Sequence, residues 1–222
     1  MYHPTIDEIK QIENCGNLVP VYREISADLE TPVSTYMKVA RPPYSFLLES
    51  VNSGNRIARY SFIGTEPYDV IKTGPGQKYG CVDPLAPIEA ALNQITPVDL
   101  SGMNGFTGGA VGYLSYDTSK YFEKIPSPER DPVGLPESVF MLTKTYLMFD
   151  HMSHKIRIVS HVNLDGDLEK AYMEATQKID ELIQRIDSPL SKKPRISKKN
   201  VPTVVKSNIT AQEYKKSVNR II

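Results

Sequence analysis

Two short runs with strand composition lie on either side of a turn-forming cluster, and this stretch constrains the fold of the chain more than any other. The runs are residues 44–51 and 59–64, and Asn52-Ser53-Gly54-Asn55 lies between them. Asn, Ser and Gly favour tight turns, so the stretch predicts a β-hairpin. Glu49 and Ser50 directly follow an apolar triplet. Polar groups at that place can hold a small polar ligand, although a solvated strand end has the same pattern.

The composition of the chain is that of an ordinary globular protein. It has 222 residues, of which 40% are hydrophobic and 23% are charged. This length allows one substantial domain or two small ones. Lys plus Arg and Asp plus Glu both number 26, so the formal net charge is zero. No global charge therefore draws the protein to nucleic acid or to an anionic membrane, and its partners must be argued from individual sites.

The two cysteines and the apolar segments indicate the compartment. Cys15 and Cys81 lie far apart and outside any C-x-x-C spacing, which argues against a disulfide framework and a zinc site. The first residues lack the basic start and apolar run of a signal peptide. No apolar stretch approaches the roughly 18 to 20 residues that a membrane-spanning helix needs. We therefore expect a soluble, cytoplasmic protein.

The remaining elements follow from apolar periodicity and capping residues. Thr5 and Thr31 each begin a helix, and Pro20 places the strand between these helices at a sheet edge or a strand start. An apolar stripe at spacings of three and four predicts a long core-facing helix near the end of the first region. The further elements that we predict are strands at 18–25 and 68–73, a helix at 84–95, a hairpin of 138–149 with 155–162, and the long helix at 167–186.

The last part of the chain changes character. Residues 188–206 contain three prolines and a basic run with no periodic apolar face, so we interpret them as a linker. The linker lacks the aromatic residues that a nucleic-acid site interleaves with basic ones. Thr210 and Glu213 then form a capping-box pattern at the start of another helix. The sequence ends within this helix, which predicts a truncated chain.

Two motifs carry a resemblance to a known family. The string LLES at 47–50, followed after a turn by RYSFIG at 59–64, is similar to the N-terminal signature of anthranilate synthase component I. This is the chorismate-utilising subunit of tryptophan biosynthesis. GFTGGAVGYLSYD at 105–117 is similar to the glycine-rich strand that follows in the same family. The resemblance extends from about residue 19 to the end of the chain. It implies an α+β fold, with largely antiparallel sheet and helices packed on the outer faces.

The resemblance also implies a regulatory site for L-tryptophan, the end product that inhibits the enzyme. Ser50 is then a contact of tryptophan, and Glu49 offsets the charge of its ammonium group. Arg59, Tyr60 and Ser61 on the opposing strand are candidates for the remaining wall. Arg59 and Tyr60 can equally be strand surface and core. Because the family builds part of this pocket from its catalytic half, we expect weak tryptophan binding, or none, by this segment alone.

The reaction of the family joins chorismate and ammonia, with Mg²⁺, to give aminodeoxyisochorismate, from which pyruvate is eliminated to leave anthranilate. A glutamine amidotransferase partner, component II, delivers the ammonia. The acid, base and metal-binding groups belong to the second half of the family's chain, and none is assigned here. The resemblance thus implies a regulatory domain at 1–187, a linker at 188–206 and the start of a truncated chorismate-binding domain at 207–222. This segment alone is predicted to be inactive and to bind no metal.

Other motifs give little sign of chemistry. The glycines of 105–112 match neither the dinucleotide-binding nor the P-loop pattern, and they favour close strand approach or a bulge. His151 and His154 lie in a predicted hairpin turn without a third metal ligand. Asp165-Gly166-Asp167 lacks the spaced ligands of a calcium loop.

Two alternative functions stay open at this point. The related aminodeoxychorismate synthase component I of folate synthesis has a similar N-terminal domain, although the intact LLES and RYSFIG strings favour the tryptophan enzyme. The other alternative is a non-catalytic amino-acid-binding module, or half of a split enzyme. Tight tryptophan binding by the 222 residues alone would favour such a sensor.

Overall fold

A computed structural model of the chain describes residues 1–12, 16–49, 59–98, 100, 107–126, 131, 133–190 and 207–221. The chain divides into two compact units, Met1–Ser191 and Lys192–Ile222. In the second unit the described residues form helix α5 (Ala211–Ile221). Its N-terminus has the predicted cap, in which the Glu213 carboxylate accepts a hydrogen bond from the Thr210 backbone N–H at 2.7 Å. No helix among the described residues is long and apolar enough to span a membrane.

The first unit is built on a five-stranded sheet in which each pair of neighbours is antiparallel. The predicted pairing of the hairpin strands is confirmed, whereas the predicted turn lies outside the described residues. One edge of the sheet is the strand that contains Pro20, as predicted. In spatial order the strands are β1 (Leu18–Ser26), β8 (Lys155–Asn163), β7 (Thr145–Asp150), β3 (Tyr60–Thr65) and β2 (Ser45–Glu49).

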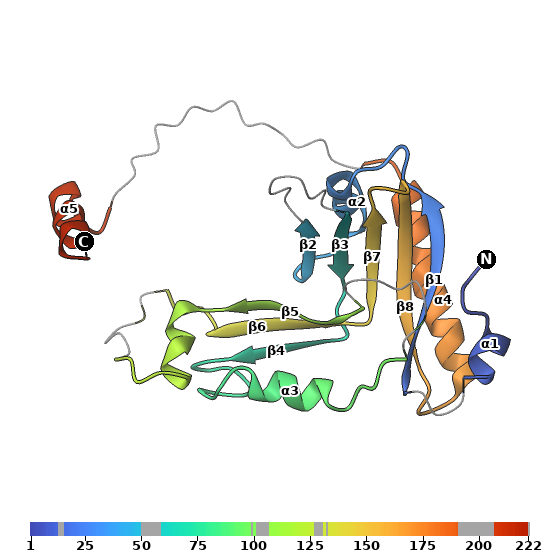
Figure 1. Cartoon of the computed structure of the whole chain (residues 1–222), viewed down its shortest axis with the longest axis horizontal. Coiled ribbons are helices and arrows are strands. Elements are labelled where there is room, and N and C mark those ends of the chain that lie inside the picture. The colour runs from blue at the N-terminus through green and yellow to red at the C-terminus, as the bar shows by residue number, and fades with distance from the viewer. Residues whose placement is uncertain are drawn as a thin grey trace. The chain divides into compact units, whose positions relative to one another are not determined.

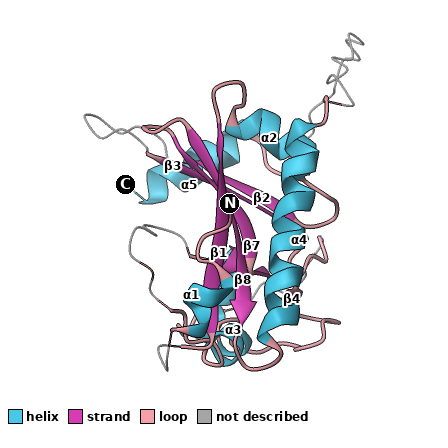
Figure 2. Ribbon diagram, turned by 90° about the vertical axis from the view of Figure 1, so that its right-hand side faces the viewer, coloured by secondary structure: helices cyan, strands magenta, loops and turns pink. Residues whose placement is uncertain are grey.

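Three helices pack on one face of this sheet (Figure 2). They are α1 (Ile6–Lys10), α2 (Pro32–Val39) and α4 (Leu168–Asp187), and Thr5, Thr31 and Asp167 are their N-caps. The predicted apolar stripe of α4 is buried, with Ala175, Ile179, Leu182 and Ile186 facing the sheet. Burial of this stripe against β1, β7 and β8 forms the main core. A smaller cluster of Tyr146, Met148 and Val159 lies on the sheet's other face.

A second sheet has three antiparallel strands, in the order β4 (Asp69–Thr73), β6 (Ser138–Thr143) and β5 (Gly109–Leu114). Figure 1 shows its strands running across those of the larger sheet, with α3 (Ala86–Leu92) beside β4. Ile88 of α3 packs against Ile71 and Leu142. A 3₁₀ helix at Tyr116–Tyr121 follows β5. The two sheets and their helices confirm the predicted α+β class.

Two glycines of the 105–112 motif, Gly108 and Gly112, have the structural role that the pattern favoured. A Cβ atom on Gly112 would lie 1.9 Å from the carbonyl oxygen of Val139 on the neighbouring strand. Gly108 has a φ of +97°, and a Cβ atom there would lie 3.0 Å from the carbonyl oxygen of Thr143. These positions therefore need glycine for close backbone approach and for a left-handed conformation.

Two sequence predictions need correction. Residues 138–149 were expected as one strand, but the strand breaks at Lys144, and its halves are β6 in the small sheet and β7 in the large one. The run of β-branched and aromatic residues is continuous, so its composition does not reveal the change of sheet. The helix expected at 84–95 is shorter, and Leu85 is 44% exposed because it precedes the first helical turn. The strand predicted at 68–73 is confirmed as β4, and it lies in the second sheet.

Candidate functional site

The end of the β2–β3 hairpin brings together most of the predicted ligand-binding residues. Glu49 is the last residue of β2 and lies opposite Ser61 in the strand register. Its side chain is exposed, and within the described residues its carboxylate makes no hydrogen bond or ion pair. Ser50, the first candidate, lies outside the described residues. Among the described residues, Glu49 is therefore an exposed carboxylate without an ionic partner at this strand end.

The Ser61 hydroxyl is engaged in the protein itself. Ser61 is 2% exposed, and its Oγ lies 2.8 Å from Nε2 of His151. His151 is also bound through its backbone N–H, which donates to the carbonyl oxygen of Arg59 at 2.9 Å. Its ring stacks on Phe149. His151 is thus an exposed turn residue whose contacts join the end of β7 to β3, a role that its position in the sequence did not reveal.

The Arg59 guanidinium is also engaged within the protein, by the Asp150 carboxylate. Its Nε and Nη2 atoms donate to the two carboxylate oxygens of Asp150, at 3.2 and 2.8 Å. This bidentate pair and the backbone N–H groups of Met152 and Ser153 lower the pKa of the Asp150 carboxyl to about 2. Arg59 is exposed, and Tyr60 is half-buried against the Tyr146 cluster. Both residues therefore have the surface and core roles that were the alternative to ligand binding.

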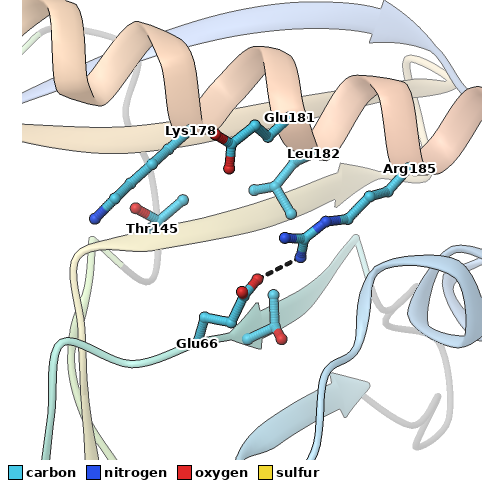
Figure 3. A pocket seen from close by; sticks show the side chains of 7 residues that line it. Glu66, Thr145, Lys178, Glu181, Leu182 and Arg185 are labelled. Atoms are coloured by element: carbon cyan, nitrogen blue, oxygen red, sulfur yellow. Dashed lines mark hydrogen bonds and ion pairs between the residues drawn. The ribbon is translucent and has the colours of Figure 1, made fainter.

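A small pocket opens between α4 and the end of β3 (Figure 3). It encloses about 150 Å³, and the Glu66 carboxylate and Arg185 guanidinium point toward each other across it in an ion pair. This pairing lowers the pKa of the Glu66 carboxyl. Arg185 also donates to the backbone carbonyl of Val39 at 3.3 Å. Glu66 and Arg185 neutralise each other's charge, and their ion pair joins α4 to the end of β3.

Two larger cavities, of about 330 and 250 Å³, adjoin on the other side of the β6–β7 connection. We call them together the Lys144 cleft, because Lys144 lines both. Leu18, Tyr68 and Ile95 also line both cavities. The Nζ atom of Lys144 lies 4.5 Å from the centre of the Tyr68 ring. Burial, and secondarily the positive charge of Lys178, lower the pKa of the Lys144 ammonium.

His161 fixes the backbone at the head of this cleft. Its backbone N–H and its Nδ1 both lie within hydrogen-bond distance of the Lys144 carbonyl oxygen, at 3.1 and 2.7 Å. A carbonyl oxygen only accepts, so Nδ1 carries the proton. His161 is 8% exposed, and burial lowers the pKa of its ring. Sequence reasoning missed both residues, and the only local signal was a lysine within an otherwise strand-like run.

The remaining polar candidates do not assemble a metal centre. No group of three or more His, Cys, Asp or Glu side chains in the described part of the chain could hold a metal ion. Cys81 is exposed and forms no disulfide, and Cys15 lies outside the described residues. The described residues therefore offer no site to which Mg²⁺ can be assigned.

Comparison with known proteins places this hairpin and its sheets in a family. Residues 43–222 match the family of chorismate binding enzymes. The chain belongs to this family. It is homologous to anthranilate synthase component 1: it is 36% identical, over 99% of its length, to a probable anthranilate synthase component 1 of Schizosaccharomyces pombe. It is 34% identical, over 98% of its length, to the anthranilate synthase component 1 of Acetivibrio thermocellus and to that of Saccharomyces cerevisiae.

The match covers only part of each relative. The chain spans 45%, 47% and 46% of these three chorismate binding enzymes, respectively. Among solved structures, anthranilate synthase component I from Streptococcus pneumoniae aligns with 74% of this chain and 37% of its own, at 22% identity and a TM-score of 0.48.

Proposed function

We propose that the chain is the N-terminal, regulatory part of an anthranilate synthase component I. The observation that carries this proposal is the identity of 34% to 36%, across nearly the whole chain, to relatives of that name in three organisms. The proposed regulatory domain is 1–187, followed by the linker 188–206 and the first residues of a chorismate-binding domain at 207–222. The reaction proposed for the whole protein converts chorismate and ammonia to anthranilate and pyruvate.

Catalysis in this proposal belongs to residues outside these 222. The chain spans less than half of its relatives, and its described residues offer no metal site and no evident acid–base pair. We therefore assign no catalytic residue to this chain. The Mg²⁺ ion of the reaction and the chorismate site are assigned to the other half. A glutamine amidotransferase, component II, is the proposed source of ammonia.

The proposed regulatory ligand is L-tryptophan, bound at the end of β2 by Ser50 and Glu49. An amino acid presents an ammonium group, a carboxylate and an apolar side chain. The exposed carboxylate of Glu49 supplies a counter-charge for the ammonium group, and it is not consumed by another described residue. Arg59 and Ser61 are engaged by Asp150 and His151, so we assign them to the support of the strand end and not to the ligand.

A chimaeric enzyme tests the proposal. Residues 1–222 replace the matching part of the Schizosaccharomyces pombe relative, and anthranilate is measured by its fluorescence after addition of chorismate, Mg²⁺ and ammonium. We expect anthranilate formation that L-tryptophan inhibits, whereas the 222 residues alone form none. The unaltered relative is the positive control.

Two outcomes would contradict the proposal. A folded chimaera that forms no anthranilate would show that the chain does not serve an anthranilate synthase. A chimaera that forms anthranilate without inhibition by tryptophan would remove the regulatory role and favour the folate-pathway alternative. Folding is checked by circular dichroism before either result is interpreted.

A further inference from the structure

The Lys144 cleft has the dimensions of a small-molecule site. Its larger cavity, of about 330 Å³, falls within the range of about 300 to 1,000 Å³ that is usual for ligand pockets. Leu18 and Leu142 are 7% and 2% exposed, and they contribute apolar surface to this cavity from β1 and β6, whereas Asn17, Gln94 and Asn163 contribute polar surface to its lining. Ile95 and Pro97 continue the apolar surface after α3, and Gly108 and Gly109 close the other side.

Among the described residues that line the cleft, Lys144 is the one cationic side chain. Lys144 is half-buried, and its ammonium group makes no ion pair within the described part of the chain. Other lysines of this unit, such as Lys38 and Lys120, pair with carboxylates. The charged neighbour that acts on Lys144 most is itself a cation, Lys178 on α4. Lys144 is thus a partly desolvated positive charge with an unmet preference for an anion.

Two carboxylates, Asp69 and Asp165, also line the larger cavity, and neither forms an ion pair with Lys144 in the described part of the chain. Asp165 accepts a hydrogen bond from Nδ2 of Asn17 at 2.9 Å, and Asp69 accepts one from the Val70 backbone N–H at 2.8 Å. The Lys144 side chain instead lies over the Tyr68 ring. That contact partly stabilises the charge and leaves the aromatic surface beside it open, since Tyr68 is 44% exposed.

We propose that the Lys144 cleft binds a small carboxylic acid with a flat apolar body. The carboxylate pairs with the Lys144 ammonium, and the body lies against Tyr68, Leu18 and Ile95. A phosphate ester fits less well, because its higher charge calls for several converging donors, and the described lining of the cleft includes one cationic side chain. The hydrogen bonds from His161 to the Lys144 carbonyl fix the position of the backbone from which the lysine side chain extends.

A titration with benzoate tests the inference on the full 222-residue protein. Amide chemical shifts are followed by NMR while benzoate is added, and neutral benzamide is titrated as the matched probe without charge. We expect saturable shifts at Tyr68, Ile95 and Leu18, and about tenfold weaker binding of benzamide, because it loses a charge-assisted hydrogen bond. This site lies outside the hairpin, so the result is independent of the proposed tryptophan site.

Two variants test whether the Lys144 ammonium is the charge that binds benzoate. Lys144→Met is expected to weaken benzoate binding about tenfold while it leaves benzamide binding unchanged. Lys72→Met is the matched control, because Lys72 is also half-buried and lies over an aromatic ring, that of Tyr44, but lines neither cavity of the cleft. Equal binding of benzoate and benzamide, benzoate shifts confined to other residues, or no saturable binding would each overturn the inference.

Discussion

The ring of His161 donates a hydrogen bond from Nδ1 to the carbonyl oxygen of Lys144, at 2.7 Å, where the chain passes from one sheet to the other. The backbone N–H of His161 donates to the same oxygen at 3.1 Å. Burial lowers the pKa of the His161 ring, so protonation of the ring is disfavoured in the folded protein. The free energy of unfolding therefore depends on the protonation state of His161.

We predict that stability falls with acidification through His161. Its pKa is lowered in the folded state, so the unfolded chain binds more protons below the unfolded value of about 6.5. The contribution is complete above that pH and is lost as the pH falls toward the folded pKa. Urea unfolding between pH 7.5 and 5 measures it. His161→Gln should flatten this slope, whereas His154→Asn, in the exposed hairpin turn, should leave it unchanged.

Replacement of Gly112 tests the close approach of β5 and β6. The new methyl group of Gly112→Ala would stand 1.9 Å from the Val139 carbonyl oxygen, so the strands must separate. We expect a loss of about 2 to 3 kcal/mol in the free energy of unfolding, as for other overpacked sites. Gly166→Ala is the control, since nothing lies within 4 Å of its added methyl group. Equal stability of the two variants in urea would contradict the close approach.

Glu66 adopts a left-handed backbone, with a φ of +50°, while its carboxylate pairs with Arg185. Glu66→Ala and Glu66→Gly both lose the ion pair, but only glycine adopts this φ without strain. We therefore expect the glycine variant to be more stable than the alanine variant by about 1 kcal/mol.

The same pair of substitutions at Glu174, on the exposed side of α4, should show the opposite order, because glycine destabilises a helix interior by about 1 kcal/mol relative to alanine. Thermal unfolding of the four variants compares the two sites. The same order at both positions would argue against the left-handed conformation of Glu66.

Local patterns predicted much of this fold from the sequence. The caps at Thr5, Thr31 and Asp167 indicated the starts of three helices, and strand composition on either side of a turn-forming cluster indicated the strands of the hairpin. These features depend on residues within a few positions of each other. The break at Lys144 was missed because the strand-like composition continues across it, and the hydrogen bond from His161 to the Lys144 carbonyl joins residues 17 positions apart.

The candidate sites were predictable to different degrees. Glu49 and Ser61 come together because a hairpin register brings nearby segments into contact. The Lys144 cleft takes its walls from β1, β4, α3 and β6, which lie up to about half the chain apart and carry no shared motif. The engagement of Arg59 by Asp150 and of Ser61 by His151 likewise depends on the pairing of β3 with β7.

The inhibition of the chimaeric enzyme by L-tryptophan tests the central claim most directly. Ser50→Ala and Glu49→Gln are each compared with the parent for the tryptophan concentration that halves anthranilate formation. Loss of one hydrogen bond to a charged group predicts an increase of about tenfold or more in each variant. Glu174→Gln, on the exposed side of α4, should match the parent. Unchanged inhibition in both hairpin variants would contradict the assignment of the tryptophan site to this strand end.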